Sequence, residues 1–145
     1  MAAPALIHGA GLAVALSLSI GAIVACSTPT LAEGDRLPTA IWGGERIQLN
    51  VTTRGGTTEY DCGHGTIDQP IDLDRDGRFS VTGTHVFEHG GPVREDEPPD
   101  RHPARYDGRV NGDAMTLTVT LTDNKQDVGT FALRRDIAPR LHKCL

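Results

Sequence analysis

The sequence has few aromatic residues and no charged side chain before Glu33. One Trp, two Tyr and three Phe occur among 145 residues, so a hydrophobic core must be built mainly from aliphatic side chains. A chain of this length has room for a single domain. The sequence therefore excludes a two-domain enzyme.

Clusters of positive charge are also missing. The chain has 14 Lys and Arg against 19 Asp and Glu, which gives a net charge of -5. Affinity for nucleic acid comes mainly from cations that neutralise many backbone phosphates and release their counterions. We therefore expect no nucleic-acid partner.

The motifs of several common catalytic chemistries are absent as well. The sequence has no Gly-x-Ser-x-Gly motif and no Cys-x-x-Cys pair, and no pattern in it places two carboxylates together. Gly63-His64-Gly65 is not followed by a helical pattern, as a phosphate-binding loop would be. We therefore predict a protein that is not an enzyme and has no cofactor.

The N-terminal segment is typical of an exported protein. Residues 10–25 form an apolar run of 16 residues, which is the length of a signal-peptide core and short for a membrane span. The run leads into Ile23-Val24-Ala25-Cys26, which resembles the lipobox of bacterial lipoproteins. The resemblance implies that residues 1–25 are a signal peptide and that the acylated Cys26 anchors the chain to a membrane of the cell envelope.

Two other outcomes for this leader remain open. Thr30-Leu31-Ala32 is a small-x-small pattern, and cleavage after Ala32 would release a secreted form without Cys26. Alternatively, the apolar run stays in place as an uncleaved membrane anchor.

The remaining two cysteines predict a disulfide. Without Cys26 the chain retains Cys62 and Cys144, and an even pair in an oxidising compartment is typically bonded. Closing a loop of about 80 residues stabilises a fold by roughly 4 kcal/mol on the chain-entropy model. The alternative is two free buried thiols in a cytosolic protein.

The body of the chain reads as short strands separated by turns. Apolar and polar residues alternate along residues 46–52, 79–88 and 115–122, which indicates strands with one buried face. Shorter candidate strands are 57–62, 66–73, 104–110 and 128–134. Asn111-Gly112 predicts a tight hairpin turn with positive φ at both central positions, and no amphipathic helix is predicted.

About seven or eight such strands predict an all-β antiparallel meander, either a small closed barrel or, alternatively, a two-sheet sandwich. We favour the barrel, because closure removes exposed strand edges. The run Tyr106-Asp107-Gly108-Arg109-Val110-Asn111-Gly112, which leads into a long alternating strand, resembles the calycin meanders of lipocalins and avidins. We assign residues 26–43 to a tether and 44–145 to the barrel, and expect a monomer.

One segment does not fit a strand or a helix. Residues 90–103 contain four prolines and two glycines among 14 residues, so we predict a long loop here. Loops of that length are uncommon in compact domains and are often functional.

Two short motifs suggest metals, and both have simpler interpretations. His85-Val86-Phe87-Glu88-His89 fits the His-x-x-Glu-His pattern of zinc peptidases, but in a strand its two histidines would lie about 13 Å apart. Asp72-Leu73-Asp74-Arg75-Asp76-Gly77 begins like a calcium loop, but Gly83 occupies the place of its last carboxylate. A plain hairpin, with Ile71 and Leu73 facing Phe79 and Val81, is the interpretation we favour.

Two classes of function remain. The first is a non-catalytic envelope module that binds a protein, a cell-wall component or a small ligand, or has a structural role. Within it, Tyr60-Asp61-Cys62, the C-terminal Cys and the lipobox together resemble the small barrel lipoproteins that inhibit lysozymes, which implies an inhibitor as an alternative. The second class is an enzyme that would use histidines brought together by the fold, namely His64, His85, His89 and His102.

Overall fold

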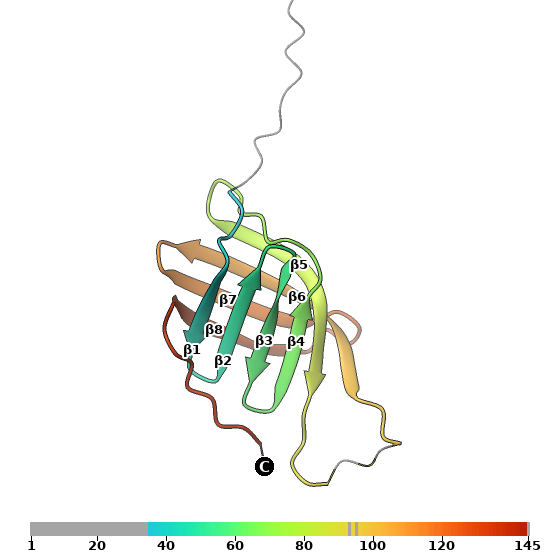
Figure 1. Cartoon of the computed structure of the whole chain (residues 1–145). Helices are drawn as coiled ribbons and strands as arrows, with labels where there is room; N and C mark the ends of the chain where they lie inside the picture. Colours follow the sequence, from blue (N-terminus) through green and yellow to red (C-terminus); the bar gives the residue numbers. More distant parts are fainter. Residues whose placement is uncertain (1–34, 93, 95, 145) are drawn as a thin grey trace, which may run out of the picture. The chain divides into compact units, whose positions relative to one another are not determined.

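The chain folds into a closed eight-stranded antiparallel β-barrel (Figure 1). The computed structural model describes residues 35–144 apart from 93 and 95, and within them there is no helix. The strands pair in sequence order, and β1 pairs with β8 to close the barrel. They are β1 Ala40–Gly44, β2 Ile47–Thr52, β3 Gly55–Tyr60, β4 Gly63–Ile67, β5 Arg78–Phe87, β6 Asp100–Asn111, β7 Ala114–Leu121 and β8 Asp127–Arg135. The predicted meander barrel is confirmed, and the sandwich is not formed.

The two-residue alternation of the sequence decides which side chains fill the barrel. In β7, Met115, Leu117, Val119 and Leu121 are buried, and the threonines between them point outward. β2 shows the same pattern, with Ile47, Leu49 and Val51 fully buried. Side chains from all eight strands form one continuous core.

The turn between β6 and β7 differs from its prediction. Because Asn111 pairs with Ala114, the central residues are Gly112 and Asp113. Only Gly112 has a positive φ, of 59°. Glycine at the first central position is what a type II′ hairpin turn requires, so the tight turn is confirmed but its two central residues lie one position later than predicted.

The predicted strand over residues 66–73 is mostly wrong. β4 ends at Ile67, and residues 68–77 form a loop. Ile71 is nevertheless buried, and its carbonyl accepts a hydrogen bond from the Leu37 backbone N–H at 2.9 Å. The loop is therefore held by the segment before β1, and it does not form the hairpin with β5 that the sequence suggests.

β6 begins at Asp100, inside the segment predicted to be a loop up to residue 103. Pro103 lies within this strand, opposite Thr84 of β5. The pairing of β6 with β7 starts at Ala104, and just past the end of β7 the Thr122 backbone N–H still donates to the Pro103 carbonyl at 2.9 Å. Proline is tolerated there because it lies at the end of this ladder, where its missing N–H costs at most a terminal hydrogen bond.

The barrel also begins earlier than predicted. β1 starts at Ala40, within the segment assigned to the tether, and Leu37 and Trp42 are buried. Apolar and polar residues do not alternate regularly around Leu37 and Trp42. The sequence pattern therefore placed the start of the barrel at residue 44. The predicted signal peptide of residues 1–25 and Cys26 lie outside the described residues.

The C-terminal segment is fixed to one end of the barrel. Cys62 and Cys144 form the predicted disulfide, with their Cα atoms 5.2 Å apart. The Cys144 N–H also donates to the Asp61 carbonyl at 3.0 Å. Figure 1 shows this segment at the end of the barrel opposite to residues 35–37 and the loop between β4 and β5.

Candidate functional site

The interior of the barrel is filled by its own side chains. Tyr106, Trp42 and the aliphatic residues of β2 and β7 are among its fully buried members. The Tyr106 hydroxyl donates to the Thr84 carbonyl at 2.6 Å, and it lies against Gly65, where a Cβ atom would collide with it. A ligand site must therefore be sought first on the outside of the barrel.

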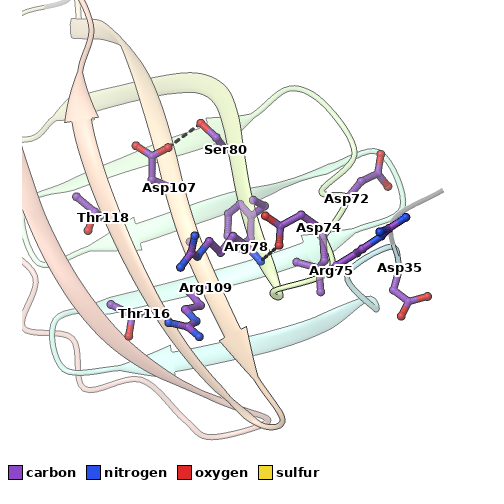
Figure 2. Close-up of a pocket in the computed structure, with 13 residues that line it drawn as sticks. Asp35, Asp72, Asp74, Arg75, Arg78, Ser80, Asp107, Arg109, Thr116 and Thr118 are labelled. Carbon is purple, nitrogen blue, oxygen red and sulfur yellow. Dashed lines mark hydrogen bonds between the residues drawn. The ribbon is translucent and has the colours of Figure 1, made fainter. Parts of the chain in front are cut away.

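A groove of about 1140 Å³ lies on the outer surface (Figure 2). Its floor is formed by β5, β6 and β7, and its rim by the loop after β4 together with Asp35. The lining residues are Asp35, Asp72, Leu73, Asp74, Arg75, Arg78, Phe79, Ser80, Asp107, Gly108, Arg109, Thr116 and Thr118. The groove thus lies beside the start of the described chain, because Asp35 is one of its lining residues.

The strand register arranges the polar floor in two rows. In the first row, Arg78 of β5 lies opposite Arg109 of β6, which lies opposite Thr116 of β7. In the second row, Ser80 lies opposite Asp107, which lies opposite Thr118. Since residues two positions apart on a strand point to the same face, both rows face the groove.

Three of the four carboxylates that line the groove, those of Asp72, Asp74 and Asp107, are engaged within the protein. Asp107 accepts hydrogen bonds from the Ser80 hydroxyl at 2.6 Å and from Arg105 Nε at 2.8 Å. Asp72 pairs with Arg36 Nε at 3.0 Å. The Asp74 carboxylate accepts the backbone N–H groups of residues 76 and 78, both at 2.8 Å.

The arginines of the groove have no such partners. In residues 35–144, as far as the structure describes them, Arg75, Arg78 and Arg109 form no ion pair with a carboxylate. Arg78 and Arg109 are both exposed and lie directly opposite each other. Like charges in that position destabilise a sheet, so an anion between them would remove an unfavourable interaction.

The aspartates of the motif that resembles a calcium loop have other contacts. Asp74 organises the turn before β5 through backbone hydrogen bonds, and Asp72 pairs with Arg36, as described above. Among the described residues, no group of three or more His, Cys, Asp or Glu is arranged to hold a metal ion. Asp76 is exposed on the turn.

Two of the four histidines lie at the opposite end of the barrel, each beside carboxylates. His64 Nδ1 lies 2.6 Å from Glu88, and this contact is the main reason why the pKa of Glu88 is lowered. His102 lies between Asp123, at 2.7 Å, and Asp100, at 3.0 Å. The hydrogen bond with Asp123 is the main reason why the pKa of His102 is raised.

The two histidines of the His-x-x-Glu-His motif differ from each other in exposure: His85 is buried and His89 is exposed. His85 is buried among aromatic rings, with its ring centroid 4.9 Å from that of Tyr60 and 4.6 Å from that of Phe87. Burial lowers its pKa. His89 is exposed after the end of β5, with Nε2 3.4 Å from a Glu97 oxygen.

Sequence reasoning missed the groove. Arg78 and Arg109 lie 31 positions apart in the sequence, and only the register of β5 with β6 brings them together. The available signal was that each occupies an outward position of an alternating strand.

Comparisons with protein-family models, with curated proteins and with solved structures find no match for this chain. Across the part of the chain that the structure describes, no helix is long and apolar enough to cross a membrane.

Proposed function

We propose that this protein is a non-enzymatic binding module of the cell envelope, exported and tethered through an acylated Cys26, which takes its ligand in the groove on the outside of the barrel. The observation that carries the binding site is the contrast between a packed interior and an open groove whose arginines form no ion pair with any carboxylate that the structure describes. The Cys62–Cys144 disulfide is consistent with export, because such bonds persist mainly in oxidising compartments.

The closed barrel supports a monomer. Every strand has two strand neighbours, and β1 is covered by β8 through three residue pairs. An unpaired strand edge is the usual template for association through β-sheet extension. Closure removes it, so the proposed module acts as a single copy attached to the membrane.

The anchoring is tested by intact-mass measurement and fractionation in the host. We expect the native protein to begin at Cys26 and to carry acyl chains, and a Cys26→Ser variant to leave the membrane fraction. A Ser27→Ala variant is the matched control and should stay with the membrane. An unprocessed, unacylated product in the cytosol would contradict the proposal.

The binding site is tested separately by NMR. An extract of envelope lipids, glycans and metabolites is added to the isotope-labelled, disulfide-bonded protein in mild detergent. We expect chemical-shift changes confined to the groove, at residues of β5, β6, β7 and the loop before β5. Changes spread over the other strands, or no change at all, would refute the groove as the site.

A further inference from the structure

We infer that the groove recognises a phosphate group, held between Arg78 and Arg109. This inference rests on the proposed function, since it names the chemistry of the ligand for the same groove. It depends on three observations: the opposition of the two arginines, the engagement of Asp72, Asp74 and Asp107 by other groups, and the Thr116 hydroxyl beside the pair.

Two opposed guanidinium groups suit a phosphate better than a carboxylate. A single arginine already satisfies a carboxylate through two parallel hydrogen bonds. A phosphate monoester carries about −1.5 to −2 charges at neutral pH and three strong acceptor oxygens. Arg78 and Arg109 together provide the charge and the fork-shaped donors for such a group, and Arg75 on the rim adds a third cation.

The position of Asp107 defines where the anion can lie. Asp107 occupies the second row of the floor, next to Arg109 along β6, and its two oxygens are held by Ser80 and Arg105. Its negative charge disfavours an anion above that row. The phosphate therefore lies over the first row, where the Thr116 hydroxyl faces the same groove opposite Arg109.

The inference does not conflict with the acidic character of the chain. Binding a nucleic acid requires many cations along an extended surface, and this chain lacks them. Binding one phosphate requires only a local pair of arginines whose charge is not already neutralised. The groove provides that pair while the whole protein remains at a net charge of -5.

The phosphate could belong to a lipid headgroup or to a soluble phosphoester. The groove includes Asp35, and nine peptide steps separate that residue from Cys26 in the sequence. An extended chain of nine residues spans about 30 Å, so lipid headgroups are within reach of an anchored groove. A soluble phosphoester such as glycerol phosphate presents a monoester, which gains its second charge near pH 6, whereas a headgroup such as phosphatidylglycerol presents a singly charged diester. Both offer phosphate oxygens to the arginines, and the experiment distinguishes them.

The experiment uses the disulfide-bonded Cys26→Ser protein and two probes. Glycerol phosphate is titrated and followed by amide shifts in β5 and β6, and vesicles of phosphatidylglycerol, with phosphatidylcholine vesicles as the reference, are followed by co-sedimentation. We expect Arg78→Gln and Arg109→Gln to weaken binding of the active probe about tenfold or more, because a charge-assisted hydrogen bond contributes about 1.5–3 kcal/mol. Arg101→Gln is the control, since Arg101 is exposed on β6 but lies eight residues from Arg109.

Two further readouts separate recognition from general loss of structure. Affinity for glycerol phosphate should rise as the pH increases through about 6, where the phosphate gains its second charge, while the arginines stay charged. In the absence of any probe, the melting temperature of Arg109→Thr should be no lower than that of the original protein, because the substitution removes the repulsion between Arg78 and Arg109.

Each outcome decides between the possibilities. Binding of glycerol phosphate alone assigns a soluble phosphoester, and binding of phosphatidylglycerol vesicles alone assigns a lipid headgroup. Loss of binding in Arg101→Gln to the same extent as in Arg109→Gln would overturn the arginine pair as the site. If the envelope extract shifts the amide signals of the groove but neither probe binds, the phosphate inference fails and the proposed function stands. If the extract shifts none of these signals, the groove is not the binding site and the proposed function itself fails.

Discussion

The Asp61 carboxylate accepts a hydrogen bond from the His142 backbone N–H at 2.8 Å, across 81 residues of sequence. Its other oxygen accepts from Arg46 Nε at 2.7 Å. Asp61 follows β3 directly, so one carboxylate joins the β1–β2 turn, the β3–β4 turn and the C-terminal segment. Together with the disulfide, it holds the end of the chain across one end of the barrel.

Asp61→Ala should release the C-terminal segment and lower the melting temperature at neutral pH. The His142 N–H, and then Arg46, lower the pKa of Asp61 in the folded protein. The stabilisation is therefore present above the ordinary Asp pKa of about 3.9 and is lost as the pH falls through the lower, folded-state value. Thermal unfolding of both proteins should give curves that differ at neutral pH and converge in acid. Asp76→Ala, at an exposed turn position, is the control; an equal effect there would contradict a specific role for Asp61.

Replacing Cys62 and Cys144 by serine should lower the free energy of unfolding by about 4 kcal/mol, as the chain-entropy model predicts for a loop of this length. The sequence separation is 82 residues. Urea unfolding of the oxidised protein and the double variant measures the difference. Titration of the denatured, unreduced Cys26→Ser protein should find no free thiol; two reactive thiols would show that the bond does not form.

The strands that could be predicted from the sequence are those in which apolar residues recur at every second position. β2 and β7 alternate strictly, and both lie close to their predicted positions with their apolar residues inside. The disulfide could be predicted because only two cysteines remain once Cys26 is assigned to the leader.

What could not be predicted depends on neighbours distant in sequence. Ile71 reads as part of a strand but pairs with the segment at Leu37, before β1. Pro103 is typical of a strand breaker, but it is accepted because it lies at the end of the β6–β7 ladder, where its carbonyl still accepts the Thr122 N–H. The opposition of Arg78 and Arg109 follows from the β5–β6 register, which a local pattern does not contain.

The pKa of His102 should lie above 6.5 in an NMR titration. The hydrogen bond to Asp123 is the main cause, and Asp100 adds to it. Since the folded-state pKa is raised, the contribution of His102 to stability is fully present below its unfolded pKa of about 6.5 and is lost as the pH rises through the folded value.

Asp123→Asn provides the test of that cause. The variant should bring the His102 pKa down and weaken the dependence of stability on pH above about 6.5. Asp76→Asn, at an exposed position of the loop before β5, is the matched control. An unchanged His102 titration in Asp123→Asn would show that this hydrogen bond is not its cause.

Gly65→Ala should destabilise the barrel by about 1–3 kcal/mol, the usual effect of overpacking a well-filled interior. A Cβ atom at this position would collide with the Tyr106 hydroxyl and come within 2.5 Å of the Thr84 carbonyl oxygen and 2.7 Å of Thr58 Oγ1. Tyr106→Phe alone should cost about 1 kcal/mol, because it removes the hydrogen bond to the Thr84 carbonyl. In the double variant the hydroxyl that meets the new methyl group is gone, so the combined loss should be smaller than the sum of the two single losses. Urea unfolding of the four proteins measures this coupling. Strictly additive losses would show that the Tyr106 hydroxyl is not the reason why glycine is required at position 65.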